Sequence, residues 1–185
     1  MKKRSKTLQG IFIALPVLVS FLLMAGCNAQ SPKNAAGKDL HTAVLQGDKK
    51  SVQQHIKAGA ALNEKDPVGG SSPLIVAALF GRTEIAAMLL EAGAAIDQQN
   101  NDGSTALHTA AFLCRKEIVA LLLKKKADKT IKNNYGQRPI DTVTGSFESV
   151  QPIYESLGKM LAPLGLQVDL QLLKNTRPVI VQLLR

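Results

Sequence analysis

The sequence predicts an all-α solenoid of about four stacked helix–turn–helix repeats with projecting turns. The stretch Thr105-Ala106-Leu107-His108 has a counterpart 33 residues earlier, at Ser72, and another 33 residues later, at Arg138. A first copy begins at Lys38, 34 residues before Ser72. A fixed period of this size is typical of stacked repeat proteins, in which each unit buries its apolar face only against its neighbours. The composition agrees, because 45% of the residues are hydrophobic but only 4% are aromatic, which suits helices packed through Ala and Leu.

Residues 1–26 have the pattern of a signal peptide. An apolar run from Ile11 to Met24 follows a basic start that contains Lys2, Lys3, Arg4 and Lys6. The next residues, Ala25-Gly26-Cys27, resemble the lipobox of bacterial lipoproteins, in which the Cys is acylated and becomes the new N-terminus. Met24 departs from this pattern, since Leu is usual there. An ordinary cleaved signal and an uncleaved anchor are the alternatives, although the run is short for a membrane span of roughly 20 residues.

The lipobox resemblance also implies a location in the bacterial envelope. In the enterobacterial sorting rule, Asp directly after the lipidated Cys retains a lipoprotein in the inner membrane, so Asn28 favours the outer membrane, facing the periplasm. Residues 27–37 are then the lipidated Cys and a short polar tether. With Cys27 acylated, Cys114 is alone and forms no intramolecular disulfide. Because the periplasm is oxidising, we expect Cys114 to be a buried structural thiol.

The third repeat shows the local logic of each unit. Asn101-Asp102-Gly103 predicts a turn, because Gly tolerates a positive φ. Thr105 then predicts a helix start, since its hydroxyl can accept hydrogen bonds from free backbone N–H groups. A short helix with an alanine face follows. A second, longer helix carries apolar side chains at three-and-four spacing, namely Ile118, Val119, Leu121, Leu122 and Leu123.

This order of turn, short helix and longer helix resembles the ankyrin repeat. The residues that match the family's structural motif are Leu40, His41, Pro73, Leu74, Gly81, Thr105, Leu107, His108 and Pro139. Pro73 fits the first helical position, where no N–H is needed. The resemblance implies an ankyrin domain over residues 38–185, with repeats at about 38–66, 67–100, 101–133 and 134–170 and a C-terminal cap at 171–185. It also implies that His41 and His108 join turn and helix by hydrogen bonds.

Two regions depart from the family pattern. In the third repeat Lys126-Ala127 replaces Gly-Ala, so we expect its second helix to end less sharply. In the fourth repeat the second helix is expected to be lengthened, from about Glu148 to Leu161. Residues 178–185 are interpreted as the first helix of a truncated fifth unit that covers the end of the stack. A β-hairpin from Leu166 to Leu184 is the competing interpretation, because apolar and polar side chains alternate along residues 166–170.

The resemblance also places a partner-binding surface on the turn tips and on the exposed ends of the first helices. The family's variable contact positions map onto Asp66, Val68, Ser71, Leu79, Phe80, Gln99, Asn101, Asp102, Ser104, Phe112, Leu113, Lys132, Asn134, Tyr135 and Gln137. The apolar pairs Leu79-Phe80 and Phe112-Leu113 stand out. They either form a contiguous exposed patch for a partner or pack under the turns and against the neighbouring repeat.

The net charge of the chain bears on which partners are expected. Four of the 23 basic residues precede Cys27, which leaves 19 basic against 14 acidic residues and a net charge of +5. The excess gathers at Arg115, Lys116, Lys124, Lys125, Lys126, Lys129 and Lys132. A solvated helix face is the favoured interpretation, with an acidic protein or an anionic lipid surface as alternatives. Nucleic acid is not expected as a partner of an exported protein.

No catalytic constellation, metal-ligand spacing or phosphate-binding loop is present in the sequence. We therefore expect no enzyme activity, cofactor, metal or small-molecule substrate. The main hypothesis is a lipid-anchored module that binds another protein in the periplasm, for example an inhibitor or immunity protein, or an envelope stress-protection factor. The alternatives are a structural envelope protein that self-associates through its open end, and an enzyme that uses Glu148, Tyr154, Glu155 or Asp169 in residues 145–185.

Overall fold

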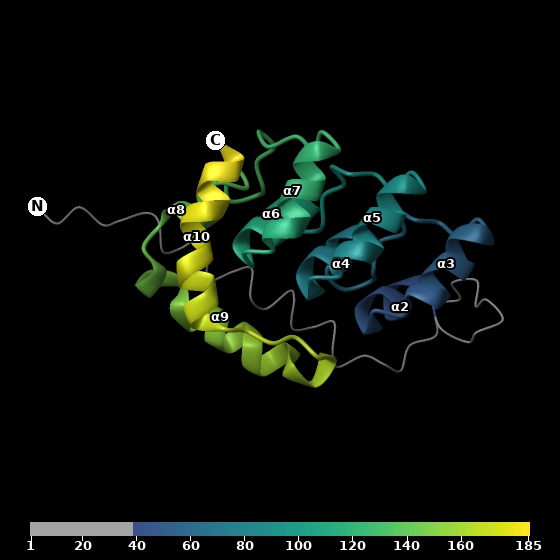
Figure 1. Cartoon of the computed structure of the whole chain (residues 1–185), viewed down its shortest axis with the longest axis horizontal. Helices are drawn as coiled ribbons and strands as arrows, with labels where there is room; N and C mark the ends of the chain where they lie inside the picture. Colours follow the sequence, from purple (N-terminus) through teal and green to yellow (C-terminus); the bar gives the residue numbers. More distant parts are fainter. Residues whose placement is uncertain (1–38) are drawn as a thin grey trace, which may run out of the picture.

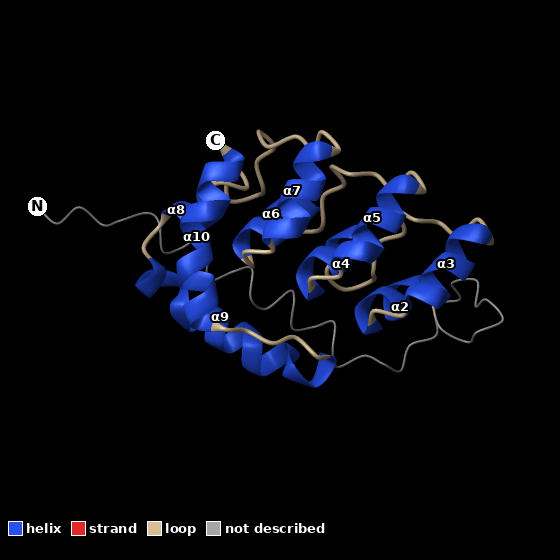
Figure 2. Ribbon diagram, viewed as in Figure 1, coloured by secondary structure: helices blue, strands red, loops and turns tan. Residues whose placement is uncertain are grey.

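The computed structural model describes residues 39–185, and it confirms the all-α ankyrin-type stack (Figures 1 and 2). The expected signal peptide (residues 1–26) and the expected lipidated Cys27 with its tether lie outside the described residues. Within residues 39–185 there is no strand. The helices in chain order are α2 (Leu40–Gln46), α3 (Lys49–Lys57), α4 (Pro73–Phe80), α5 (Thr83–Glu91), α6 (Ala106–Phe112), α7 (Lys116–Lys124), α8 (Asp141–Thr144), α9 (Phe147–Leu161), the 3-10 helix η1 (Ala162–Leu164) and α10 (Leu170–Leu184).

The inner helices α4 and α6 begin where the sequence predicts. Asp39, Ser72 and Thr105 each accept a hydrogen bond from a backbone N–H in the first turn of the helix that follows. Pro73 occupies the first turn of α4, as expected, and His108 completes a capping box with Thr105. These contacts satisfy N–H groups that no intrahelical carbonyl can reach, and they fix where each hairpin starts.

The stack has two layers, which both run along its length. The inner helices pack side by side, and the outer helices α3, α5 and α7 pack behind them. Five fully buried alanines allow the inner helices to approach closely, namely Ala43, Ala77, Ala78, Ala110 and Ala111. All the buried apolar side chains of the described part lie between residues 40 and 184, so this part contains its own core.

The fourth repeat differs from the expected arrangement. A helix does span the lengthened segment, but α9 leaves the stack and lies below the ends of α4 and α6 (Figure 1). The place of the fourth outer helix is taken by α10, which packs against α7 and α8. The hairpin interpretation is therefore wrong, and residues 170–184 complete the fourth repeat rather than start a fifth. A buried row at positions 173, 177, 180 and 184 gives α10 the helical spacing that this role requires.

The end of α7 also corrects an expectation. Lys126 adopts the left-handed conformation, with φ 65°, that Gly93 adopts at the end of α5. Its N–H donates to the carbonyl of Leu123 at 2.9 Å, and the N–H of Ala127 donates to that of Leu122 at 2.9 Å. The helix α7 therefore ends as sharply as the others. Lysine in place of glycine at position 126 instead strains the backbone, because a Cβ disfavours the left-handed region.

Replacing Lys126 with Gly is expected to increase the free energy of unfolding by about 1 kcal/mol, because Gly occupies the left-handed region without steric cost. The matched control is Lys125→Gly. Lys125 has φ −87°, so glycine there should lower stability by a few tenths of a kcal/mol or more. Denaturant unfolding of both variants measures the difference, and equal effects would show that φ at residue 126 carries no strain.

Candidate partner-binding site

The turns between repeats are each held by the hydrogen bonds of one side chain. We call residues 66–71, 100–104 and 133–137 the finger turns. The Asp66 carboxylate accepts hydrogen bonds from backbone N–H groups of its own turn at 2.6–2.9 Å, including that of Ser71. Asn100 and Asn133 do the same in the next two turns. Asp66 was expected to contact a partner, but its side chain is buried and used inside the turn.

Neighbouring finger turns are joined in a hydrogen-bonded ladder. The Asn101 side-chain amide donates to the carbonyl of Val68 at 3.1 Å, and that of Asn134 donates to the carbonyl of Asn101 at 2.9 Å. Backbone N–H groups of the same asparagines donate to Gly69 and Asp102. These bonds hold successive turns in register, so the surface at their tips is pre-organised.

The motif histidines connect the inner helices α2 and α6 to the next finger turn. Nε2 of His41 lies 3.0 Å from the carbonyl oxygen of Ser71, and Nε2 of His108 lies 2.9 Å from that of Gln137. Nδ1 of His108 accepts from the backbone N–H of Thr105. Burial lowers the pKa of His108, which keeps the ring neutral and suits this pattern of one donating and one accepting nitrogen. The expected structural role of both histidines matches these contacts.

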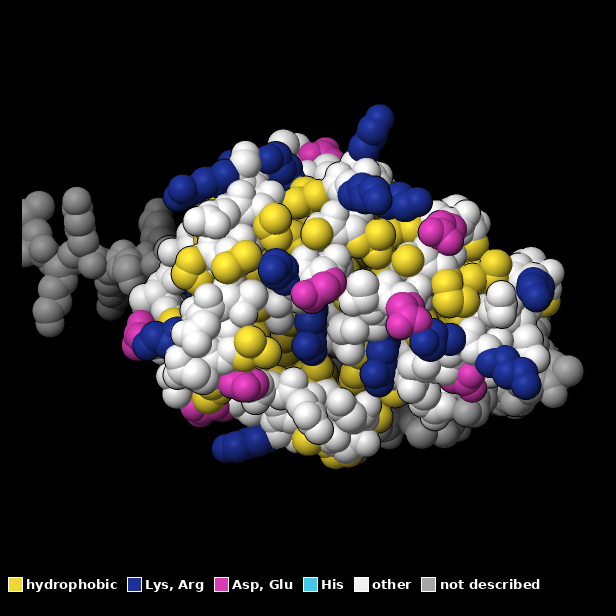
Figure 3. Space-filling model, viewed as in Figure 1, with side chains coloured by type: hydrophobic (Ala, Val, Ile, Leu, Met, Phe, Trp, Pro, Cys, Tyr) yellow, Lys and Arg dark blue, Asp and Glu magenta, His cyan; other side chains and the backbone are white. Residues whose placement is uncertain are grey.

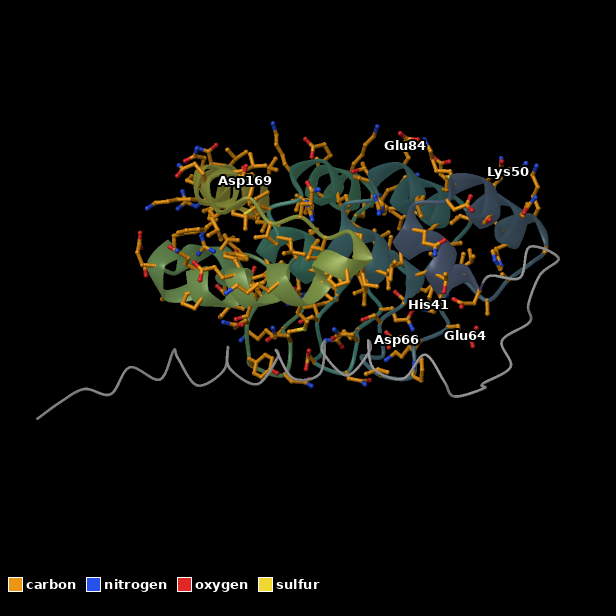
Figure 4. The ribbon with its side chains drawn as sticks, turned by 90° about the horizontal axis from the view of Figure 1, so that it is seen from below. His41, Lys50, Glu64, Asp66, Glu84 and Asp169 are labelled. Atoms are coloured by element: carbon orange, nitrogen blue, oxygen red, sulfur yellow. The ribbon has the colours of Figure 1, made fainter. Side chains whose placement is uncertain are left out.

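Ten of the remaining predicted contact residues stay at least partly accessible along the finger turns. Asn101, Lys132 and Asn134 are exposed, and Asn101 and Asn134 use their amides in the ladder. The partly exposed members are Val68, Ser71, Gln99, Asp102, Ser104, Tyr135 and Gln137. We call Val68, Lys132 and Tyr135 the finger-tip row, since their side chains reach the surface and form no ladder bond to a neighbouring backbone. In Figure 4 the label Asp66 marks this side of the molecule, opposite Glu84 on the outer helix α5.

The inner-helix ends, by contrast, are covered by the chain itself. The rings of Phe112 and Tyr154 stack with centroids 4.7 Å apart, and Leu161 of α9 lies beside Phe80 in the lining of one small cavity. Phe80 and Leu113 are buried, while Leu79 and Phe112 keep partial exposure. The four side chains therefore do not form an open patch. Of the two alternatives, packing is the one observed, and α9 contributes cover that neither alternative had anticipated.

A chain of hydrogen bonds fixes α9 in this place. The Tyr154 hydroxyl donates to the carbonyl of Phe112 at 2.6 Å and accepts from Arg177 Nη1 at 3.1 Å. Arg177 Nη2 donates to the carbonyl of Gly145 at 2.8 Å. Arg177 is only 5% exposed, so these hydrogen bonds satisfy a buried guanidinium group. Burial raises the pKa of Tyr154 to about 12, so its hydroxyl remains a donor. The sequence analysis did not identify Arg177 as a residue that holds α9 in place. The one feature that could have identified it is its position in the buried row of α10, among apolar residues at helical spacing.

The chemistry around α9 is structural. The Cys114 sulfur lies 3.7 Å from the carbonyl oxygen of Leu173, and burial raises the pKa of the thiol to about 11, which disfavours the reactive thiolate. The cavity between α9 and the finger turns has a volume of ≈ 30 Å³, room for about one water molecule. Burial there raises the pKa of Asp102. A wider, open depression of ≈ 640 Å³ lies between α8, the start of α9 and α10. Its lining includes Lys174 and Glu148, which form an ion pair at 3.1 Å.

Two further observations concern residues 39–185. No three His, Cys, Asp or Glu side chains there come together in a group that could hold a metal ion. None of the helices in the same range combines the length and the hydropathy that crossing a bilayer requires.

Paired helices, laddered turns and histidines that bridge them define a helical repeat protein built for surface recognition. The family model "Ankyrin repeats (3 copies)" matches residues 40–133, about half of the sequence. The chain therefore belongs to the ankyrin repeat family.

Individual relatives share the repeats over a limited range. The chain is 31% identical over 82 residues to glycerophosphocholine phosphodiesterase gde1 of Schizosaccharomyces pombe, and 32% identical over 80 residues to inversin of Homo sapiens. These matches cover 44% and 43% of this chain but only 7% of each relative. The solved ankyrin repeat domain of Bcl-3, a member of the IkappaB family, is similar with a TM-score of 0.57 and 28% identity, over 70% of this chain and 57% of that one.

The ladder predicts a difference between two glycines of nearly equal φ, Gly103 at 73° and Gly136 at 74°. A Cβ on Gly103 would lie 2.6 Å from Oδ1 of Asn134 and 2.8 Å from its backbone nitrogen, whereas one on Gly136 meets nothing within 4 Å. Gly136→Ala should lower the free energy of unfolding by about 1 kcal/mol through φ alone. Gly103→Ala should lower it by roughly 2 kcal/mol more, since the ladder must open. Similar losses in denaturant unfolding would contradict the ladder.

The two tyrosines offer a second matched pair. Tyr154→Phe leaves the carbonyl of Phe112 and one N–H of Arg177 buried without this partner, and should lower the free energy of unfolding by about 1–3 kcal/mol. Tyr135→Phe removes only a 3.4 Å contact with Asp102 near the surface, so a loss below about 0.5 kcal/mol is expected. Thermal and denaturant melts compare the two. A harmless Tyr154→Phe would show that the hydroxyl does not hold α9.

Proposed function

We propose that this chain is a lipid-anchored protein-binding module of the bacterial envelope that holds its partner with the finger-tip row. Ankyrin repeats are protein–protein interaction modules, and the repeats of this chain span residues 40–133. The observation that carries the proposal is the ladder, because it fixes exposed side chains from successive repeats on one rigid surface. Such pre-organisation reduces the entropy lost when a partner binds.

The position of α9 narrows the mode of binding. It fills the space beside Phe80 and Phe112, so a partner meets the finger turns and the outer side of α9 rather than bare inner-helix ends. The finger turns offer backbone and amide groups with few large apolar side chains. This composition suits recognition by hydrogen bonds around a small apolar contact such as Val68 and Tyr135.

The envelope location is supported by the sequence before residue 39. The basic start, the apolar run and Ala25-Gly26-Cys27 favour export and acylation of Cys27, and Asn28 favours the outer membrane with the domain facing the periplasm. In that compartment, a rigid binding surface suits an inhibitor or immunity protein that covers a toxic enzyme, or a factor that protects the envelope under stress. The role is non-enzymatic, in keeping with what is typical of the ankyrin fold.

Acylation is tested in cells that express the full chain. Metabolic labelling with an alkynyl palmitate should mark the wild-type chain, and Cys27→Ala should abolish the label and the shift from precursor to mature mass. Cys114→Ala is the matched control, because that thiol is half-buried in the repeat domain and should leave labelling unchanged. Labelling that survives Cys27→Ala would contradict the lipid anchor.

Partner binding is tested by capture from solubilised envelope, with partners identified by mass spectrometry. Val68→Ser/Tyr135→Ser should lower recovery of the partner at least about tenfold, because removing central contacts commonly costs 1–2 kcal/mol each. Leu172→Ser is the control, since Leu172 is 62% exposed on α10, away from the finger turns. All three proteins should melt alike. Unchanged recovery by the double variant would overturn the finger-tip row as the binding site.

A further inference from the structure

One edge of the molecule carries an unusual concentration of positive charge. We call Lys124, Lys125, Lys126 and Lys129 the lysine edge, and all four are exposed at the end of α7 and in the turn after it. In Figure 3 dark blue side chains gather along the upper edge of the view. Residues 124–129 contain four lysines and one aspartate, a net charge of +3. The equivalent residues of the preceding repeat, 91–96, carry Glu91 and a net charge of −1.

Lys126 of the lysine edge has a backbone conformation that glycine adopts more easily than lysine. Residue 126 has φ 65°, and the equivalent positions of the first two repeats, Gly59 and Gly93, are glycines with φ 74° and 93°. A Cβ on those glycines would meet nothing within 4 Å, so the position is strained by φ and not by crowding. Strain of this kind that packing does not require points to a use for the side chain.

Charges of the lysine edge are not neutralised within the part of the chain that the structure describes. The ion pairs formed there are Lys49–Glu84, Arg138–Asp141 and Lys174–Glu148, all elsewhere. Lys129 Nζ donates to the main-chain oxygen of Arg185 at 2.8 Å. The nearby Asp128 carboxylate accepts hydrogen bonds from the backbone N–H and hydroxyl of Thr130, and its charge offsets one of the four lysines. Lys124, Lys125 and Lys126 therefore present ammonium groups that form no ion pair with a side chain of residues 39–185.

We propose that the lysine edge binds the anionic lipid headgroups of the membrane to which the chain is anchored. Lysine is depleted from protein interfaces, and its ammonium group is strongly hydrated, so four lysines on flexible stems suit a diffuse anionic surface better than a packed protein contact. Each such lysine near an anionic membrane strengthens binding roughly fivefold. The lysine edge lies at the end of the outer helix α7, and Figure 4 shows Glu84 of the outer helix α5 on the opposite side of the molecule from Asp66 of the finger turns.

This inference rests on the proposed envelope location, because the anchor keeps the domain close to lipid. Residues 28–38 can span at most about 40 Å when fully extended. That reach lets the domain settle on the bilayer, and a weak electrostatic contact then acts at high local concentration.

The test uses residues 28–185, which include the whole core and lack Cys27, with folding checked by a cooperative melt. The probe is co-sedimentation with vesicles of phosphatidylglycerol and phosphatidylethanolamine, at low and high salt. Lys124→Gln/Lys125→Gln/Lys129→Gln should weaken binding roughly 100-fold. The matched control, Lys50→Gln/Lys57→Gln/Lys65→Gln, removes the same charge from exposed positions of the first repeat and should change binding less than about fivefold. Binding by the wild-type chain should also fall in high salt and with phosphatidylcholine vesicles.

Lys126→Gly separates this role from a structural one. It should weaken vesicle binding roughly fivefold while raising the melting temperature, whereas a lysine needed only for folding would lower both. Equal losses in both triple variants, or no binding to anionic vesicles at low salt, would overturn the proposal. Unchanged vesicle binding by the first triple variant with lost capture of a partner would instead assign the lysine edge to an acidic protein. Because the tested chain lacks Cys27, its vesicle binding tests the lysine edge independently of whether Cys27 is acylated in cells.

Discussion

Close approach of the inner helices is the constraint on which this molecule depends. Each hairpin is too small to bury its own apolar face, so it must lie against the next one. Alanines at positions such as 77, 78, 110 and 111, all fully buried, bring the helix backbones together. At that distance His108 reaches the finger turn of the following repeat and Arg82 reaches the carbonyl of Leu45, so the same packing that forms the core also fixes the turns.

The fourth repeat shows how the chain solves two problems with one insertion. The end of a stack exposes the apolar side of its last outer helix, and the inner-helix ends expose Phe80 and Phe112. Residues 145–169 carry α9 under those ends and return the chain so that α10 can pack on α7 and α8. Tyr154 and Arg177 join α6, α9, α10 and the turn at Gly145 through buried hydrogen bonds, which a low-dielectric interior strengthens.

The two proposed surfaces follow from different physical features of the same repeats. The finger-tip row is rigid because asparagine amides and backbone groups tie each turn to the last. The lysine edge is flexible because long side chains extend from a helix end, and it acts through charge rather than shape. Under the two proposals, the finger-tip row recognises a partner while the lysine edge meets a membrane. Under the second proposal, the φ of 65° at Lys126 lowers stability locally, and lysine occupies this position because of its positive charge.

The sequence by itself determined the repeat architecture, because its period, caps and turn residues are local signals that tertiary packing only reinforces. Thr105, Pro73 and Gly81 act where the pattern places them, and the helix over residues 147–161 was expected to within one residue. Amphipathic spacing shows that a helix has an apolar face but not which surface that face will cover. Only the tertiary structure therefore decided that α9 covers the inner-helix ends, that α10 completes the fourth repeat, that Asp66 is buried, and that Lys126 keeps a left-handed backbone.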